Sequence, residues 1–213
     1  MTRSLEELIA AVGDGSRLPV AEMFHTVQGE GAHTGCAAYF VRLGGCDVRC
    51  PWCDARYTWE GTDAPLTAVT DVARQAAASG APAVVITGGE PTLFPLEPLT
   101  GALAAAGLQV WMETSGTHLP DGRFDWICLS PKRHRPPLGE ACRMADELKV
   151  VVGTEEDLAW AETCAGRVRP DCRLFLQPEW GRRTEAMALI VAYVKAHPRW
   201  RISLQTHKYM DIP

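Results

Sequence analysis

The sequence predicts an α/β fold, built as an incomplete, partial TIM-like barrel with a largely parallel sheet. Two observations lead to this prediction. Short apolar runs alternate with amphipathic helical segments along the chain, a pattern that favours a parallel sheet. Polar clusters recur directly after the expected strands, where a barrel collects its chemistry. A complete eight-fold barrel usually needs about 250 residues, and the chain has 213, so we expect the barrel to be partly open.

Length and composition indicate a single globular domain. Apolar residues make up 46% and charged residues 22% of the chain, which is ordinary for a soluble protein. The net charge of −5 argues against a nucleic acid or a membrane as partner. Residues 1–18 are too polar for a signal peptide, and no apolar run reaches transmembrane length. We therefore expect a cytoplasmic protein with an N-terminal extension over 1–18 and one domain over 19–213.

The first half of the chain supplies the first strands of the sheet and its first helices. A short helix is expected over 4–12, ended by Gly13. Apolar spacing predicts a helix over 65–80 and another over 96–106. An unbroken apolar run over 83–87 is typical of a parallel strand that is covered on both faces. Strands are expected at 19–27, 37–43, 83–87 and 108–113.

The second half continues the alternation. Helices are expected over 154–165 and 184–197, the first with a capping sequence at Thr154 and the second stopped by Pro198. Strands are expected at 124–129, 147–152, 173–177 and 201–205. The polar clusters that follow strands lie at 87–90, 113–116, 130–132, 177–179 and 205–208. The loop over 28–31 has two glycines that allow close approach to a ligand, although its spacing alone favours a simple turn.

Three cysteines within eight residues form the clearest chemical signal. Cys46, Cys50 and Cys53 are spaced C-x3-C-x2-C, and thiolates so close together require a metal or oxidation. Structural zinc takes four protein ligands, whereas three fit a 4Fe-4S cluster with one open iron. Cys36 is a minor alternative as a fourth ligand. Small buried hydrophobic side chains are the expectation for the other cysteines, which are Cys128, Cys142, Cys164 and Cys172.

These motifs resemble a known superfamily. The cysteine spacing, with an aromatic residue before the third cysteine, resembles the radical S-adenosylmethionine signature, and residues 88–91 resemble its motif for the cofactor's amino group. Further segments resemble the 7-carboxy-7-deazaguanine synthase family, at 28–31, 53–54, 87–91, 113–117, 130–132 and 205–208. The resemblance runs from about residue 19 to residue 213, which is nearly the whole chain. It implies a lyase that contracts 6-carboxy-5,6,7,8-tetrahydropterin to 7-carboxy-7-deazaguanine with loss of ammonia, in queuosine and 7-deazapurine precursor biosynthesis.

The resemblance also implies roles for individual residues. The cluster ligands are Cys46, Cys50 and Cys53. S-adenosylmethionine contacts are expected at Trp52, Asp54, Gly89, Glu90, Ser130, Pro131, Lys132, Gln177, Pro178, Glu179 and Trp180. Trp52 could equally be a core aromatic residue. Within the basic stretch 132–135, the residues after Lys132 are expected to form a solvated loop.

Substrate contacts are implied at Val27, Gln28, Gly29, Arg42, Thr87 and Pro213. Arg42 suits the pterin carboxylate because its planar guanidinium binds carboxylates through two hydrogen bonds; a structural ion pair is the alternative. In this family a C-terminal proline can meet the amino-pyrimidine edge of the pterin with its free carboxylate. Relatives often carry Thr as a magnesium ligand where this chain has Ala55, so we expect weak or absent magnesium dependence.

Two other functions compete with this interpretation. A glycyl-radical-enzyme activase shares the cysteine and Gly-Gly-Glu motifs but has no reason to carry segments 28–31 and 205–208. A zinc-bearing nucleic-acid module would need a fourth ligand and a basic face, and the chain is acidic. The expected partners are the pterin and a reductant such as flavodoxin or ferredoxin. A homodimer is expected because relatives form symmetric dimers.

Overall fold

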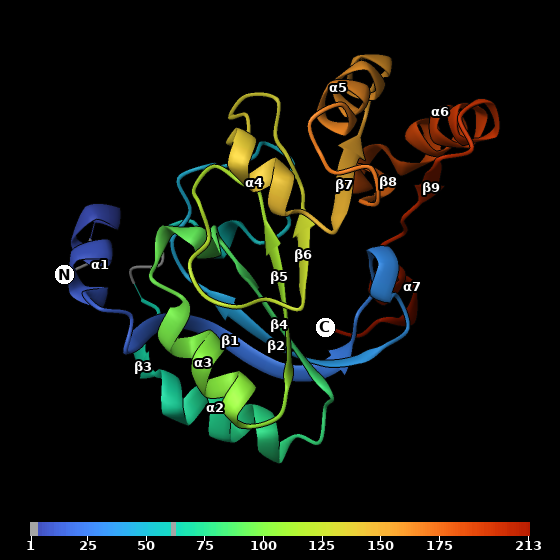
Figure 1. Cartoon of the computed structure of the whole chain (residues 1–213). Coiled ribbons are helices and arrows are strands. Elements are labelled where there is room, and N and C mark those ends of the chain that lie inside the picture. The colour runs from blue at the N-terminus through green and yellow to red at the C-terminus, as the bar shows by residue number, and fades with distance from the viewer. Residues whose placement is uncertain (1–3, 61–62) are drawn as a thin grey trace.

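The structure is a computed structural model that describes residues 4–60 and 63–213, and it has the predicted α/β architecture (Figure 1). Within the described residues the strands form one sheet in the order β3-β1-β2-β4-β5-β6-β7-β8-β9. From β2 onward all neighbours in this order are parallel, whereas β1 is antiparallel to both β2 and β3. Since β3 and β9 end the sheet without pairing to each other, the barrel is incomplete, as predicted.

The strands have the following bounds: β1 (Arg17–Val27), β2 (Ala37–Leu43), β3 (Leu66–Ala68), β4 (Ala83–Gly88), β5 (Gln109–Thr114), β6 (Trp126–Leu129), β7 (Glu147–Val152), β8 (Arg173–Pro178) and β9 (Trp200–Ile202). The helices are α1 (Leu5–Val12), α2 (Val69–Ala78), α3 (Glu97–Ala105), α4 (Gly139–Met144), α5 (Glu155–Ala165), α6 (Arg183–Ala196) and α7 (Thr206–Met210). Within the two described ranges, none of the helices combines the length and the apolar character that a membrane span needs.

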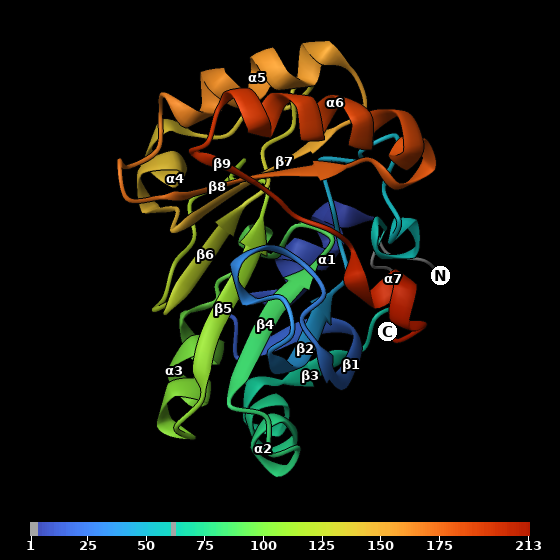
Figure 2. The ribbon, with the colours of Figure 1, turned by 90° about the vertical axis from the view of Figure 1, so that its right-hand side faces the viewer.

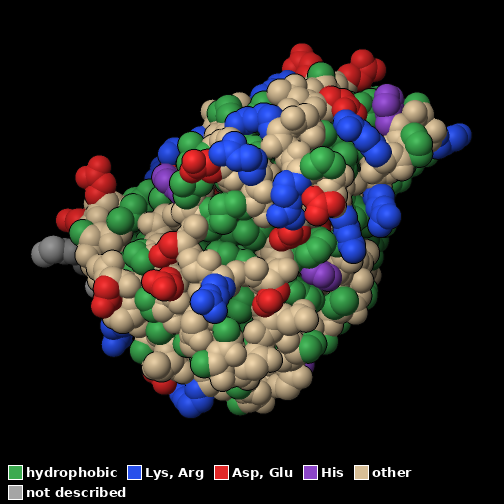
Figure 3. Space-filling model, in the orientation of Figure 1, with side chains coloured by type: hydrophobic (Ala, Val, Ile, Leu, Met, Phe, Trp, Pro, Cys, Tyr) green, Lys and Arg blue, Asp and Glu red, His purple; other side chains and the backbone are tan. Residues whose placement is uncertain are grey.

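Helices cover the outside of the sheet in two groups, each with its own core (Figure 2). In the first half, α1, α2 and α3 pack on β1, β2, β4 and β5 through side chains such as Leu8, Ile86 and Leu99. In the second half, α5 and α6 lie side by side over β7 and β8, with Leu148 and Ile190 in their core. Charged residues of both signs are interspersed on the face shown in Figure 3.

The segment expected as an N-terminal extension packs into the first core. Ser4 and Glu7 form a reciprocal capping box that starts α1, satisfying backbone donors that the first helical turn leaves unpaired. Leu8 and Val12 are buried with the strand residues. Leu18 is fully buried within β1, so the expected boundary at residue 18 falls inside a strand. Residues 1–3 of that segment lie outside the described residues.

Three predictions of secondary structure were wrong in detail. The helix expected over 65–80 begins only at Val69, because residues 66–68 pair with the edge of β1 as strand β3. The last strand stops at Ile202 rather than at residue 205, and the cluster after it starts α7. Helices α4 and α7 were not predicted at all. With six and five residues, they are too short to show a helical period.

Candidate functional site

A cavity of about 430 Å³ opens at the carboxyl ends of the parallel strands. Alternation along each strand explains its polar lining, because successive side chains face opposite sides of a sheet. In β7, for example, Leu148 and Val150 face the helices and enter the second core, while Lys149 lines the cavity. In the same way Thr87 and Glu113 of β4 and β5 line the cavity. The inner face of the barrel is therefore polar near the carboxyl ends of the strands, whereas further along it carries an apolar cluster that includes Val85 and Trp111.

All but one of the residues expected at the site line this cavity. The exception is Pro131. The expected residues that line it are Val27, Gln28, Gly29, Arg42, Cys46, Cys50, Trp52, Cys53, Asp54, Ala55, Thr87, Gly89, Glu90, Ser130, Lys132, Gln177, Pro178, Glu179, Trp180 and Pro213. Residues from the ends of five strands, the cysteine loop and the chain terminus thus converge on one space.

The cysteine loop is held by hydrogen bonds from outside itself. Cys46 N donates to the carbonyl of Trp59 at 2.8 Å. Arg135 donates from Nη1 to the carbonyl of Asp47 at 2.7 Å, and Nε2 of His134 lies 3.0 Å from the carbonyl of Val48. The stretch 132–135, expected to be a solvated loop beyond its first residue, therefore clamps the backbone of the cysteine loop.

The Gly-Gly-Glu motif packs directly against the cysteines. A side-chain carbon at Gly89 would overlap the carbonyl oxygen of Gly45 and lie 2.9 Å from Cβ of Cys46, so only glycine allows this approach. Glu90 N donates to the carbonyl of Gly45 at 2.9 Å. The two motifs of the sequence are thus one structural unit.

The cysteine donor set fits an iron–sulfur cluster better than a single ion. Cys46 and Cys50 are buried, and Cys53 is half-buried beside them. Burial raises the pKa of Cys50 to about 11, so a thiolate here needs a cation to stabilise it. Within the described residues, no three His, Cys, Asp or Glu side chains are grouped so that they could hold one metal ion. A cubane spreads its thiolates over separate irons, and three thiolates around an open cavity suit it.

The carboxylate of Glu90 joins two strand ends in the wall of the cavity. Its side chain is only 1% exposed, and its carboxylate accepts hydrogen bonds from Oγ1 of Thr114 at 2.6 Å, Oγ1 of Thr92 at 2.7 Å and the backbone N of Ser115 at 2.8 Å. A buried carboxylate needs such donors to remain charged. Glu90 therefore ties the end of β4 to the end of β5 and places its carboxyl group beside the cysteine loop.

The residues expected around S-adenosylmethionine lie on two sides of the cysteine loop. Lys132 Nζ donates to the carbonyl and hydroxyl oxygens of Ser130 at 2.7 and 2.6 Å. Across the cavity, Nζ of Lys208 lies 4.8 Å from the ring centre of Trp180, a cation–π contact. Trp52 is 39% exposed and meets His134 edge-on. It is therefore not a core aromatic residue.

Arg42 lines the cavity and also makes the ion pair that was its alternative role. Its Nε lies 2.5 Å from Oε1 of Glu22, and its guanidinium stands over the ring of Phe24. Tyr57 donates to the same Glu22 oxygen at 2.6 Å. Because the pair with Glu22 uses Nε, the Nη groups of Arg42 can still meet a carboxylate in the cavity.

The C-terminal segment closes the cavity over the first loop. Thr206 N donates to the carbonyl of Gly29 at 2.9 Å, and Thr26 donates from Oγ1 to the backbone oxygen of Pro213 at 3.2 Å. Lys208 donates to Asp54 at 2.8 Å. Burial opposes ionisation of Asp54, but the hydrogen bond and charge of Lys208 outweigh it and lower its pKa.

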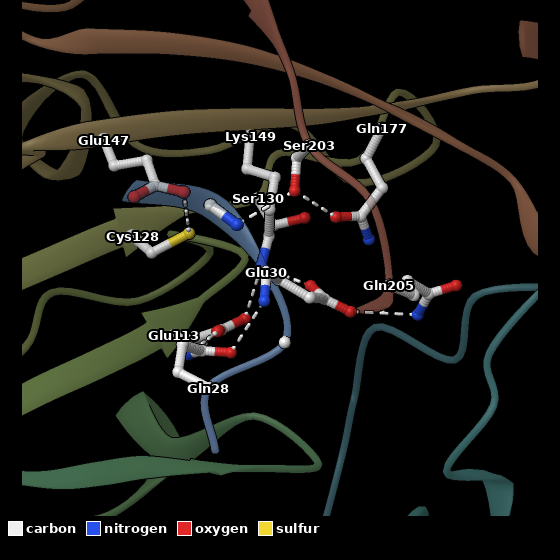
Figure 4. Close-up of polar contacts among 12 residues, drawn as sticks. Gln28, Glu30, Glu113, Cys128, Ser130, Glu147, Lys149, Gln177, Ser203 and Gln205 are labelled. Atoms are coloured by element: carbon white, nitrogen blue, oxygen red, sulfur yellow. Dashed lines mark hydrogen bonds and ion pairs between the residues drawn. The ribbon is translucent and has the colours of Figure 1, made fainter. Parts of the chain in front are cut away.

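A buried ion network beneath these loops was missed by the site prediction (Figure 4). Lys149 pairs with Glu30 at 2.5 Å and with Glu113 at 2.8 Å. Gln28 donates to the second oxygen of Glu113, and Gln205 donates to the second oxygen of Glu30. A lysine inside the apolar strand sequence Glu-Leu-Lys-Val-Val-Val is the signal that could have revealed the network, since charged side chains are rarely buried unpaired.

Comparisons with known proteins agree with this geometry. A model of the radical SAM superfamily matches residues 40–128. The chain is 48% identical over 208 residues to the 7-carboxy-7-deazaguanine synthase of Flavobacterium psychrophilum, covering 98% of this chain and 99% of that one. It is 34% identical to the Escherichia coli protein of the same name, covering 91% and 98%. The crystal structure of QueE from Escherichia coli superposes with a TM-score of 0.77 at 32% identity, covering 92% of this chain and 97% of that chain.

Proposed function

The chain belongs to the 7-carboxy-7-deazaguanine synthase family, and from this we propose how its own residues carry out the family's reaction. It is a radical S-adenosylmethionine lyase. It contracts 6-carboxy-5,6,7,8-tetrahydropterin to 7-carboxy-7-deazaguanine with loss of ammonia, a step in queuosine precursor biosynthesis. The observation that supports the assignment of residues is the single cavity that joins the cysteine loop, the Gly-Gly-Glu motif and the C-terminus.

In our proposal Cys46, Cys50 and Cys53 hold a 4Fe-4S cluster. Their burial beside the open cavity supports this assignment, since it leaves room for a ligand on the remaining iron. When bound, the cluster and S-adenosylmethionine supply one-electron cleavage of a carbon–sulfur bond and abstraction of a hydrogen atom. The clamp from His134 and Arg135 on the loop backbone keeps the three sulfurs in place.

S-adenosylmethionine would lie between Glu90 and the segment after β8. Glu90 offers a carboxyl group near which an ammonium group could bind, and Gly88 and Gly89 line the same part of the cavity. Ser130 and Lys132 line one side, and Gln177 to Trp180 line the other. These residues orient the cofactor and keep water from the reacting atoms, which is the protein's share of the chemistry.

The pterin would occupy the part of the cavity under the C-terminal segment. Arg42 is the proposed partner of its carboxylate, because Glu22, which also accepts from Tyr57, fixes the guanidinium through Nε. Val27, Gln28, Gly29 and Thr87 line the same part of the cavity. The carboxylate of Pro213, tethered near Thr26, can accept hydrogen bonds from the amino-pyrimidine edge.

Magnesium is not required in this proposal. Ala55 lines the cavity with a methyl group, so the side-chain oxygen that relatives use is missing. Asp54 is the nearest carboxylate in sequence, and it is paired with Lys208 at 2.8 Å. The ammonium of Lys208 therefore supplies a positive charge beside the substrate region without a metal ion.

Other features of the working enzyme are also proposals. The reductant is a one-electron carrier such as a flavodoxin or ferredoxin. A homodimer would cover open sheet edges such as β3 and β9. The cysteines of the described residues are all free, which suits the reducing cytoplasm. An acidic chain with interspersed surface charges supports a small-molecule partner rather than nucleic acid or membrane.

The proposal is tested by anaerobic reconstitution with iron and sulfide. The protein is incubated with the carboxy-tetrahydropterin, S-adenosylmethionine and a reductant, and mass spectrometry follows the products. We expect 7-carboxy-7-deazaguanine together with release of ammonia. Protein that carries its cluster and cleaves S-adenosylmethionine, yet yields no deazaguanine, would overturn the assignment.

A further inference from the structure

Lys149 is an unusual residue for the strand in which it lies. Its side chain is 3% exposed, while the residues on either side, Leu148 and Val150, belong to the apolar core between β7 and the helices. Strand alternation turns Lys149 the other way, into the barrel. Burying an ammonium group costs much free energy unless partners compensate for the lost water.

The partners come from two distant parts of the chain. Lys149 Nζ lies 2.5 Å from Oε2 of Glu30, in the loop after β1, and 2.8 Å from Oε2 of Glu113, in β5. The other oxygen of each carboxylate is also held: Gln205 donates to Glu30 at 2.9 Å, and Gln28 donates to Glu113 at 3.1 Å. Figure 4 shows the two carboxylates converging on the lysine from separate elements.

All five side chains of this network line the cavity. A network that served only to stabilise the fold would have no reason to line the cavity. One ammonium group between two carboxylates leaves one negative charge in excess, and that charge faces the substrate region. The two carboxylates contact the same nitrogen, so without it they would lie close enough to repel each other.

We infer that Lys149 is a positioning residue, which fixes Glu30 and Glu113 as a pair of ionised acceptors for N–H groups of the bound heterocycle. The inference rests on the proposed substrate site. It assigns to Lys149 no contact with the substrate, but control over the charge and direction of two carboxylates that contact the bound ring. All four oxygens of the two carboxylates accept from protein donors, so the carboxylates have little freedom left, which favours binding of a rigid ring.

The charges around the network support this role. Burial opposes the charge on Lys149, but the carboxylates around it, which are Glu113, Glu30 and Glu147, help to raise its pKa well above the usual value. Burial also opposes ionisation of Glu30, and Lys149 outweighs it and lowers the pKa of that carboxyl. His207 faces Glu30 from α7, and burial lowers its pKa. The ammonium of Lys149 is thus the cation on which ionisation of Glu30 depends.

Lys149→Met tests the inference, because Met keeps most of the side-chain volume and removes the charge. We expect normal iron content and normal cleavage of S-adenosylmethionine without substrate, since neither site contains Lys149. Equilibrium binding of the carboxy-tetrahydropterin should weaken roughly thirtyfold or more, the effect of leaving buried charges without their partner. The acid limb of the pH–rate profile should move to higher pH, because one carboxylate then protonates more easily.

Lys149→Arg should recover part of the binding, since it restores the cation. Lys195→Met, at an exposed position of α6, should match the wild type. If Lys149→Met does not fold, the double variant Lys149→Met/Glu113→Gln returns the network to its original net charge, and we expect it to fold and still bind the pterin weakly. Wild-type pterin binding in Lys149→Met or in the double variant would overturn the inference, and so would equal losses in Lys149→Met and Lys149→Arg. Absence of deazaguanine from the wild-type enzyme would instead count against the proposed function.

Discussion

A side-chain carbon at Gly29 would lie 2.8 Å from the backbone nitrogen of His207. The two residues belong to the first loop and the last helix of the chain, and Thr206 N also donates to the carbonyl of Gly29 at 2.9 Å. The antiparallel start of the sheet and the C-terminal segment therefore meet directly over the cavity. Their contact covers part of the cavity that the incomplete barrel leaves open.

Gly29→Ala should push α7 away from the first loop and weaken pterin binding. Overpacking of this kind costs about 1–3 kcal/mol, so we expect the KM for the pterin to rise roughly tenfold. Gly101→Ala is the matched control, because its new methyl group meets no neighbouring atom within 4 Å. Steady-state kinetics of both variants measure the KM for the pterin, and thermal unfolding measures the stability cost. An unchanged KM in Gly29→Ala would mean that the contact does not shape the site.

We predict that Cys46 is required to hold the cluster and that Cys36 is not. Cys46→Ser should abolish the brown chromophore of anaerobically reconstituted protein, because two thiolates cannot hold the cluster. Cys36→Ser should keep full iron content, since Cys36 is exposed and does not line the cavity. Iron analysis and the visible spectrum measure both. Loss of iron in the Cys36 variant would restore that residue as a ligand.

Most of the site could be predicted from the sequence because its residues lie in short local motifs. The cysteine spacing, the Gly-Gly-Glu segment and the polar ends of strands are all visible within a few residues. Lys149 was missed because nothing next to it in sequence reveals its partners, Glu30 and Glu113, which lie 119 and 36 positions away. Strand β3 was missed for a similar reason: only its pairing with β1 makes residues 66–68 extended rather than helical.

The dependence of turnover on magnesium should be set by the residue at position 55. A chelator added to reconstituted wild-type enzyme should reduce turnover less than about twofold, because Ala55 offers no ligand and magnesium affinity depends on oxygen donors. Ala55→Thr restores the hydroxyl of the relatives and should gain a magnesium-stimulated component of kcat/KM. Turnover measured with and without chelator in both proteins decides this. A large loss in the wild type would show that the ion binds through other oxygens.

Glu30 predicts a specific dependence of stability on pH. Burial opposes its ionisation, but Lys149 lowers its pKa below the usual 4.5. A carboxyl whose pKa is lower when folded adds stability above its unfolded pKa and loses it as pH falls through the folded value. The free energy of unfolding of the wild type should therefore fall more steeply below pH 4.5 than that of Glu30→Gln. Glu185→Gln, at an exposed position of α6, serves as control, and parallel curves for the wild type and Glu30→Gln would contradict the prediction.

The C-terminal carboxylate should be part of the substrate site. Pro213 lines the cavity, and Thr26 Oγ1 donates to its backbone oxygen at 3.2 Å, so the chain end is tethered beside the first strand. A Gly-Ser extension after Pro213 converts the carboxylate into an amide and adds bulk at the mouth of the cavity.

We expect this extension to raise the KM for the pterin at least about tenfold, since a charge-assisted hydrogen bond contributes roughly 1.5–3 kcal/mol. Cluster content and cleavage of S-adenosylmethionine without pterin should stay unchanged. The same extension placed before Met1 is the control, because α1 does not line the cavity. Thr26→Val should give a smaller increase in KM, as it removes the tether and keeps the carboxylate. Full pterin affinity in the C-terminally extended protein would exclude Pro213 from the site.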